Sequence, residues 1–208
     1  MKVKQGLFPP LDNNCYLLVD EATNCSALID CSCWDRRMEA LIGDTDLQYI
    51  LLTHGHFDHI GGIGAVKEKY GAKIVISNED APMLSSPAKS LAAFSGFRKQ
   101  EAILPDITVD EGDTIQVGGI TVSVLKTPGH TVGGVCYLAE DCLFTGDTLF
   151  CESCGRTDFP GGSMQQIIQS LHRLAALEGD YAVFPGHGET TTLSHERQYN
   201  PYMRDLCY

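Results

Sequence analysis

Four apolar runs in this sequence each end in a tight turn that carries histidine or aspartate, and this arrangement constrains the fold more than any other feature. The turns are THGHFDH at residues 53–59, TPGHT at 127–131, TGDT at 145–148 and PGHG at 185–188. The runs before them, such as YILL and AVF, are typical of buried strands. Because rigid strand ends commonly carry functional side chains, a fold that gathers these four turns would form a polar site.

Strand-like and helix-like segments alternate along the rest of the chain. Strands are expected at residues 15–19, 26–30, 47–53, 72–77, 135–139, 142–146 and 181–186, with a hairpin at 114–127. Helices are expected at residues 34–43, 61–71 and 163–177. Residues 79–104 are expected to form an irregular excursion with one short helix. Groups of strands separated by helices predict an α+β fold, in which two sheets pack together and helices cover them.

Length and charge narrow the classes of function. At 208 residues the chain suits one domain of fair size. Its formal net charge of −12 gives no general attraction to nucleic acid or to an anionic membrane surface, so neither is expected as a partner. No apolar run approaches the length of a membrane span, and the first residues lack the apolar core of a signal peptide. We therefore expect a cytoplasmic protein whose nine cysteines are reduced.

The four turns together carry side chains that bind zinc and similar metals. His54 and His56 lie two positions apart and could share one ion, whereas the adjacent Asp58 and His59 could reach a second position. The candidate ligands exceed what one tetrahedral ion needs, but two ions that share Asp147 would use them all, and paired ions can activate a bridging water. The full set of candidate metal ligands is His54, His56, Asp58, His59, His130, Asp147 and His187.

The segments THGHFDHIGG, TPGHT, FTGDTLF and FPGHGETT, in this order, resemble the metallo-β-lactamase-fold hydrolases. The resemblance extends from about residue 12 to residue 201, and the ending GHGETTTLSHERQYNP is most similar to short bacterial glyoxalase II-like proteins. It implies a four-layer αββα sandwich with a metal site at one edge of the two sheets. It also implies that one metal is held by His54, His56, His130 and Asp147, and the other by Asp58, His59, Asp147 and His187.

This resemblance implies a metal-dependent hydrolase that cleaves a small-molecule thioester, or a related acyl substrate, by means of a metal-bridged hydroxide. Two divalent ions are expected as cofactors, with zinc as the first choice and iron or manganese as alternatives. Asp58 would be a ligand and also the catalytic residue that orients the hydroxide. Arg156 aligns with a basic residue that contacts the thiol carrier in long glyoxalase II enzymes, so it is expected to bind substrate; its alternative is an ion pair with Asp158. The chain is expected to form a single domain over residues 1–208, without the C-terminal helical substrate region of the long enzymes.

Other functions remain as alternatives. A mononuclear-iron persulfide dioxygenase of the same fold is the second hypothesis, because GRTDF also occurs in those enzymes and His54, His130 and Asp147 suit an iron triad. Nuclease activity is disfavoured by the negative charge. β-Lactam hydrolysis is disfavoured because residue 147 is Asp where those lactamases use Cys. The segment CESC, from Cys151 to Cys154, has redox-motif spacing but no thioredoxin-like surroundings.

Overall fold

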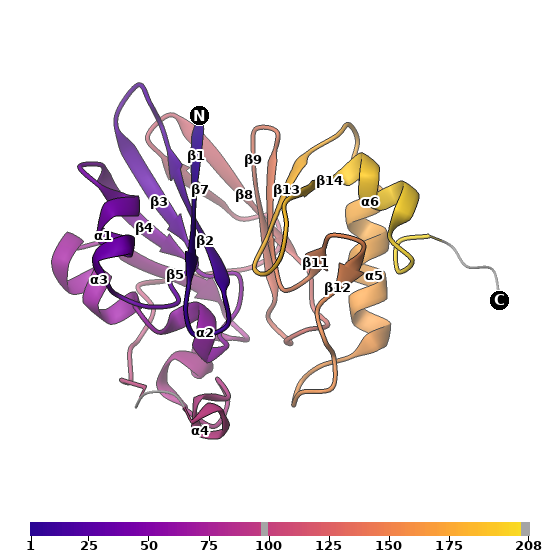
Figure 1. The fold of residues 1–208 in the computed structure, drawn as a ribbon, viewed down its shortest axis with the longest axis horizontal. Coiled ribbons are helices and arrows are strands. Elements are labelled where there is room, and N and C mark those ends of the chain that lie inside the picture. The colour runs from indigo at the N-terminus through magenta and orange to yellow at the C-terminus, as the bar shows by residue number, and fades with distance from the viewer. Residues whose placement is uncertain (97–99, 205–208) are drawn as a thin grey trace.

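The computed structural model describes residues 1–96 and 100–204 and places their strands in two six-stranded sheets (Figure 1). The first sheet runs in the order β1 (Lys2–Phe8), β2 (Asn13–Val19), β3 (Cys25–Ile29), β4 (Asp46–Leu51), β5 (Lys73–Ser77) and β6 (Ile107–Val109). The second runs in the order β14 (Thr191–Thr192), β13 (Ala182–Pro185), β10 (Cys142–Gly146), β9 (Val135–Ala139), β8 (Ile120–Lys126) and β7 (Thr114–Val117). A separate hairpin consists of β11 (Leu149–Phe150) and β12 (Ser153–Cys154).

Helices cover the outer faces of both sheets, as Figure 1 shows on its left and right sides. The first sheet packs against α1 (Arg36–Ile42) and α3 (Ile63–Tyr70). The second sheet packs against α5 (Met164–Ala175) and α6 (Leu193–Tyr199). The shorter helical segments are α2 (Phe57–Ile60), η1 (Ala81–Ser85) and α4 (Ala92–Ser95). The predicted four-layer αββα sandwich is therefore confirmed.

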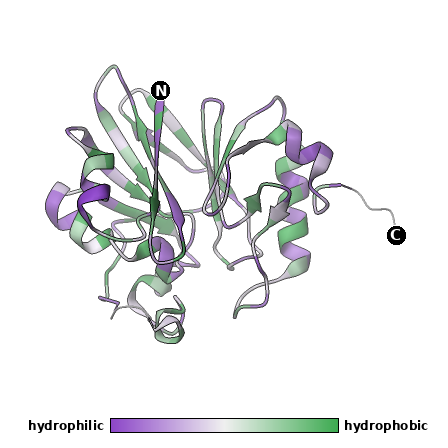
Figure 2. Ribbon diagram, in the orientation of Figure 1, coloured by the Kyte–Doolittle hydropathy of each residue, from purple (hydrophilic) through white to green (hydrophobic). Residues whose placement is uncertain are grey.

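Alternation along the strands produces these layers. In β2, Tyr16 and Leu18 face the second sheet, whereas Leu17 faces the helices of the first outer layer. From the second sheet, Val122 and Val124 meet them in the core between the sheets. Successive strand side chains point to opposite faces, so a strand that is apolar throughout must be covered on both sides. Figure 2 accordingly shows hydrophobic ribbon in both sheets and hydrophilic residues mainly on the helices and loops outside.

Caps set the ends of the helices. α1 begins at Arg36, two residues later than predicted, because the side chain of Asp35 caps it by accepting bonds from two backbone amides. It ends at Gly43, whose φ of 61° suits glycine. α3 ends in the same way at Gly71, with φ 71°. Both helices therefore end at the glycines that the sequence indicated.

The sequence analysis missed several short or exposed elements. β1 pairs antiparallel with β2, but only one of its seven residues is buried, and so it lacks a strong apolar pattern. α6 has seven residues, too few for a clear helical period. The excursion at 79–104 contains η1 and α4, and its residues 97–99 lie outside the described residues. The predicted hairpin at 114–127 is present as β7 and β8.

Four strand ends meet at one edge of the sandwich. β10 and β13 are parallel, and both β8 and β10 are antiparallel to β9, so β8, β10 and β13 all end at the same edge. The end of β4 reaches this edge from the other sheet, because the carbonyl of Thr53 accepts a hydrogen bond from the amide of Val135 at 2.9 Å. The polar turns predicted after these strands consequently face one another.

The eight cysteines among the described residues are free. Within the described part of the chain, none of the helices has both the length and the apolar character needed to cross a membrane. The assignment of residues 1–208 to a single domain stays a prediction.

Candidate metal centre

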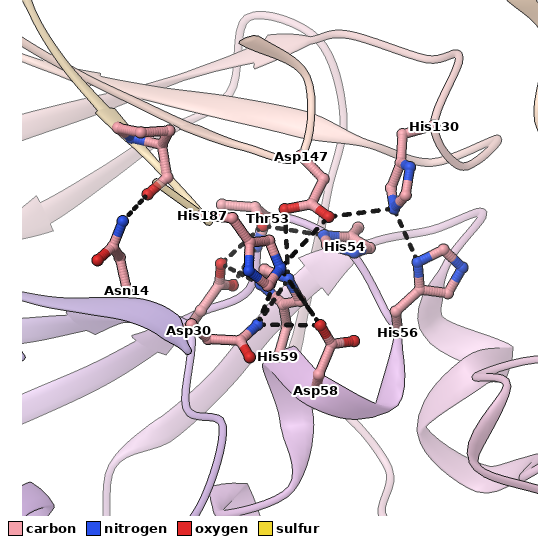
Figure 3. A network of polar contacts seen from close by, with 12 residues as sticks. Asn14, Asp30, Thr53, His54, His56, Asp58, His59, His130, Asp147 and His187 are labelled. Atoms are coloured by element: carbon pink, nitrogen blue, oxygen red, sulfur yellow. Dashed lines mark hydrogen bonds and ion pairs between the residues drawn. The ribbon is translucent and has the colours of Figure 1, made fainter. Parts of the chain in front are cut away.

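One group of predicted ligands lies where the turn after β4 meets the turn after β8 (Figure 3). His54, His56 and His130 offer ligand atoms that all lie within 4.8 Å of one another. The closest pair is His56 Nδ1 and His130 Nε2, which are 2.9 Å apart. Asp147, on the turn after β10, points its Oδ2 atom at His130 Nε2 from 3.5 Å. Three imidazoles and a carboxylate therefore converge on one position.

The remaining predicted ligands form a second group beside the first. Asp58, His59 and His187 also offer atoms within 4.8 Å of one another. His187 Nε2 lies 3.4 Å from Asp58 Oδ2 and 3.7 Å from Asp147 Oδ2. His59 Nε2 lies 3.4 Å from the other oxygen of Asp147. Asp147 thus stands between the two groups, where a bridging ligand would be.

Buried polar atoms without partners show that this centre fits metal ions. Among the described residues, His54 Nε2, Asp147 Oδ1 and Asn13 Oδ1 are buried and have no hydrogen-bond partner. An unsatisfied buried polar atom is costly, and the first two of these atoms belong to predicted ligands. The Asn13 amide nitrogen also lies 3.0 Å from Asp58 Oδ2 and 3.1 Å from His59 Nε2, among atoms that could hold a cation. The donor set of imidazoles and carboxylates suits zinc or iron.

Hydrogen bonds at the far side of two rings fix which nitrogen faces the centre. His59 Nδ1 donates to Asp30 Oδ2 at 2.8 Å, and His130 Nδ1 donates to the carbonyl of Arg156 at 2.7 Å. In each ring Nε2 is therefore the atom left for a metal. Burial opposes a charge on His59, but the carboxylates of Asp147 and Asp30 raise its pKa well above the usual value. A bound cation would replace that proton.

The pKa values of three other candidate ligands are shifted in the opposite direction, which also favours metal binding. Burial lowers the pKa of His56 to about 3, and the neighbouring His130 adds to this effect. Burial also holds the pKa of His54 well below its usual value. Burial raises the pKa of Asp147, but the nearby charge of His59 outweighs this and lowers the pKa overall. At neutral pH these rings offer lone pairs and the carboxylate is ionised, as metal binding requires.

Two glycines in the motifs allow the turns to approach this closely. A Cβ atom on Gly186 would lie 2.5 Å from Asp147 Oδ1 and 2.8 Å from His59 Cε1. Gly146 has a φ of 47°, and a Cβ there would lie 2.3 Å from Thr53 Oγ1. Any other residue would push the ligand turns apart, which explains why glycine precedes His187 and Asp147.

Two buried aspartates that the sequence analysis did not single out hold the ligand turns in place. Asp30 accepts bonds from Thr53 N and Thr53 Oγ1, both at 2.8 Å, as well as from His59. Asp30 therefore ties the start of the first turn to the second group of ligands. Its only sequence signal was its position at the end of a predicted strand.

Asp80 holds the turns that carry the first group of ligands. It is fully buried and accepts hydrogen bonds from Gly55 N at 3.2 Å, Thr131 Oγ1 at 2.7 Å and Gly133 N at 2.9 Å. Gly55 lies between His54 and His56, and Thr131 follows His130. One carboxylate therefore joins the two turns that carry the first group.

Substitution of each aspartate is expected to weaken one of the two metal positions more than the other. Asp80→Asn should weaken metal binding at the first group by about 10- to 100-fold, because an amide cannot accept all three bonds and the turns lose their alignment. Asp30→Asn should weaken the second group more than the first, because His59 loses its carboxylate partner. The metal affinity of each position is measured by following the stepwise release of metal to a competing chelator. Equal losses at both positions in each variant would contradict these separate roles.

A cavity of about 840 Å³ opens beside the metal centre. Its polar floor includes Asp58 and Asp147, and apolar side chains including Leu11, Phe94 and Phe159 form its walls. A second cavity, of about 630 Å³, lies beyond Phe57, which lines both cavities. The first cavity alone reaches the predicted ligands and is the candidate substrate site.

Arg156 lines this cavity, as the sequence analysis expected, but its guanidinium already has a partner. Nε and Nη2 donate to the two oxygens of Asp158 at 2.7 and 2.6 Å, and the group lies 4.0 Å from the ring centre of Phe159. This bond to Arg156 lowers the pKa of Asp158 to about 2. The predicted alternative, an ion pair with Asp158, is present, while Arg156 still lies at the cavity.

Comparisons with known proteins agree with this geometry. A family model described as "Metallo-beta-lactamase superfamily" matches residues 8–187. Among curated proteins, "Hydroxyacylglutathione hydrolase GloC" of Haemophilus influenzae is 35% identical over 196 residues and covers 91% of this chain and 92% of its own. The match therefore spans almost the whole of both proteins.

Solved structures of proteins with different names share this fold. BLEG-1, described as a B3 metallo-beta-lactamase, has a TM-score of 0.91 and 30% identity, covering 97% of this chain and 99% of its own. TTHA1623 in a di-iron-bound form has a TM-score of 0.84 and 32% identity, covering 96% and 99%. ETHE1 from Myxococcus xanthus has a TM-score of 0.81 and 33% identity, covering 97% and 84%. The fold is thus shared by proteins whose names indicate more than one activity.

Proposed function

Since the chain belongs to the metallo-β-lactamase superfamily and is 35% identical to a hydroxyacylglutathione hydrolase, we propose that it is a thioester hydrolase of the glyoxalase II type. The family and this relative support the wider class, a metal-dependent hydrolase. The observation that carries the proposal is the pair of ligand groups with the Asp147 carboxylate between them, opening on a cavity. Such a site suits attack of an activated water on an acyl group.

The chain supplies ligands, orientation and a place for the substrate. When bound, two divalent ions lower the pKa of a water and polarise a carbonyl oxygen. Burial raises the pKa of Asp58, but the charge of His59 and hydrogen bonds from His187 and Asn13 outweigh this and lower it overall. Asp58 is therefore ionised, and from its position beside the cavity it would orient the attacking water.

The cavity and the net charge support a small-molecule substrate. Leu11 and Phe94 line the cavity and are 49% and 77% exposed, so an acyl group or thiol carrier with apolar parts would cover them. The charge of −12 makes nucleic acid and anionic membranes poor partners. The free cysteines support a place in the reducing cytoplasm.

Arg156 should matter only for thioesters that carry an anionic group. Arg156→Ala is expected to lower kcat/KM for such a substrate by about tenfold or more, because a charge-assisted hydrogen bond contributes about 1.5–3 kcal/mol. Asp158→Asn should raise it by no more than a few-fold, because the substrate then no longer displaces an exposed ion pair, and such pairs are weak. Steady-state kinetics on an anionic and a neutral thioester test both. Equal losses with Arg156→Ala on the two substrates would point to a structural role.

The test of the proposed function combines metal analysis with a substrate panel. Protein purified without added metal is analysed for its elements, then assayed on S-lactoylglutathione, on glutathione persulfide with an oxygen electrode, and on a β-lactam. We expect two ions per chain and hydrolysis of the thioester. Cleavage of the β-lactam alone would overturn the proposal.

The persulfide dioxygenase remains the second candidate. The structural similarity to ETHE1 favours it, and the similarity to a di-iron form of TTHA1623 shows that relatives of this fold hold iron. In this reading His54, His130 and Asp147, which lie together, would hold a single iron. Oxygen uptake with persulfide by protein containing one iron, without thioesterase activity, would establish this alternative.

A further inference from the structure

A second set of ligand-type side chains lies apart from the seven predicted ligands, at the turn of the β11–β12 hairpin. Cys151 and Glu152 form the turn, and His195 lies in the first turn of α6. The ligand atoms of these three residues, a thiol sulfur, a carboxylate oxygen and an imidazole nitrogen, all lie within 4.8 Å of one another. We call them the hairpin cluster.

Neighbouring contacts hold the hairpin cluster in place. The backbone amide of Glu152 donates to the carboxylate of Glu196 at 2.8 Å, and Glu196 is fully buried. The amide of His195 donates to the capping hydroxyl of Thr192 at 3.2 Å, and its ring lies 4.7 Å from the ring of Tyr199. These contacts fix the position of the backbone on both sides of the cluster.

The spacing within the cluster is close to that of a metal site. His195 Nε2 and Glu152 Oε1 are 3.0 Å apart. Tetrahedral zinc with bonds of about 2.0–2.3 Å separates its ligand atoms by roughly 3.3–3.8 Å. Small side-chain rotations would therefore bring the two atoms to metal-binding distance, with Cys151 close enough to join them.

Charge and ligand type indicate which ion would bind. The carboxylates of Glu196, Glu152 and Glu189 all act on the Cys151 thiol, so the local field is negative and favours a cation. A thiolate with an imidazole and a carboxylate suits zinc, whereas magnesium and calcium prefer oxygen ligands alone.

We propose that Cys151, Glu152 and His195 form a third metal site that takes zinc or a similar divalent ion, with one position left for water. This ion would join the hairpin to α6. Because Phe150, Ser153 and Cys154 of the hairpin line the cavity beside the metal centre, the third ion would stiffen one wall of the substrate site.

Cobalt distinguishes this site from the main centre. The predicted ligands of the main centre are histidine and aspartate, whereas only a thiolate ligand gives bound Co²⁺ an intense near-ultraviolet charge-transfer band. The full chain, as purified, is titrated with Co²⁺. We expect the band to grow to one cobalt per chain, and added zinc to remove it.

Variants assign the band to the cluster. Cys151→Ser should abolish it, whereas Cys154→Ser, on the same hairpin, should leave it unchanged. His195→Ala should weaken cobalt binding by at least about tenfold, because one of three protein ligands is lost. Circular dichroism, together with the amount of metal bound by the seven predicted ligands, verifies that each variant is folded. No band at excess cobalt in the wild type, or a band that survives Cys151→Ser, would overturn the third site and would leave the proposed function untouched.

Discussion

Alanine in place of Asp147 is expected to abolish turnover, by about 10³-fold or more, and to lower the content of both metal ions. The reason is the position of this carboxylate. Oδ1 lies 3.4 Å from His59 Nε2, and Oδ2 lies 3.5 Å from His130 Nε2 and 3.7 Å from His187 Nε2. Its carboxylate faces histidines of both groups, so its loss should weaken both ions together. Elemental analysis after gel filtration, with steady-state kinetics, measures the result.

The matched control is Asp44→Ala, which removes an exposed carboxylate from the turn before β4. It should leave both metal content and turnover unchanged. Two ions that stay tightly bound in the Asp147 variant would contradict the bridging role and leave Asp147 as a ligand of neither.

Asp58→Asn is expected to lower kcat by about 10²-fold or more while the fold stays intact, because an amide of the same shape can neither accept a proton nor carry the charge. Asp58 is 5% exposed and receives a hydrogen bond from Asn13 Nδ2 at 3.0 Å. Its Oδ2 also lies 3.4 Å from His187 Nε2, so one metal position should weaken as well. Circular dichroism, metal content and kcat are measured on the same preparation.

The metal content separates the two roles of Asp58. If kcat stays low after excess metal has restored two ions, then orientation of the water is the main role. If excess metal restores turnover fully, then Asp58 is a ligand alone. Near-normal turnover without added metal would show that Asp58 has neither role.

The candidate ligands could be found from the sequence because their signals are local. A buried strand, a turn with glycine and a histidine or aspartate occupy adjacent positions, as in the turns that carry His54, His130 and His187. Period-two patterns likewise predicted the strands, and capping residues predicted the helix ends at Gly43 and Gly71. The structure brings all seven predicted ligands together, and their roles in binding metal stay a prediction.

The residues that support this centre could not be found in the same way. Asp80 bonds to Gly133, 53 positions along the chain, and the Asn13 amide lies 3.2 Å from His187, 174 positions away. Aspartate and asparagine in a loop are typical of ordinary turns, so nothing in their neighbourhood indicated a role at the centre. Only the folded chain shows that Asp30 and Asp80 join the ligand turns.

The sequence by itself determined which side chains are the candidate metal ligands and that two covered sheets would hold them, because strand periodicity and turn chemistry are properties of neighbouring residues. The tertiary structure alone decided how those side chains divide into two groups around Asp147. That division depends on how one sheet packs on the other. Contacts between the sheets join residues that are far apart in the sequence, so the order of residues in the chain does not show which of them will meet.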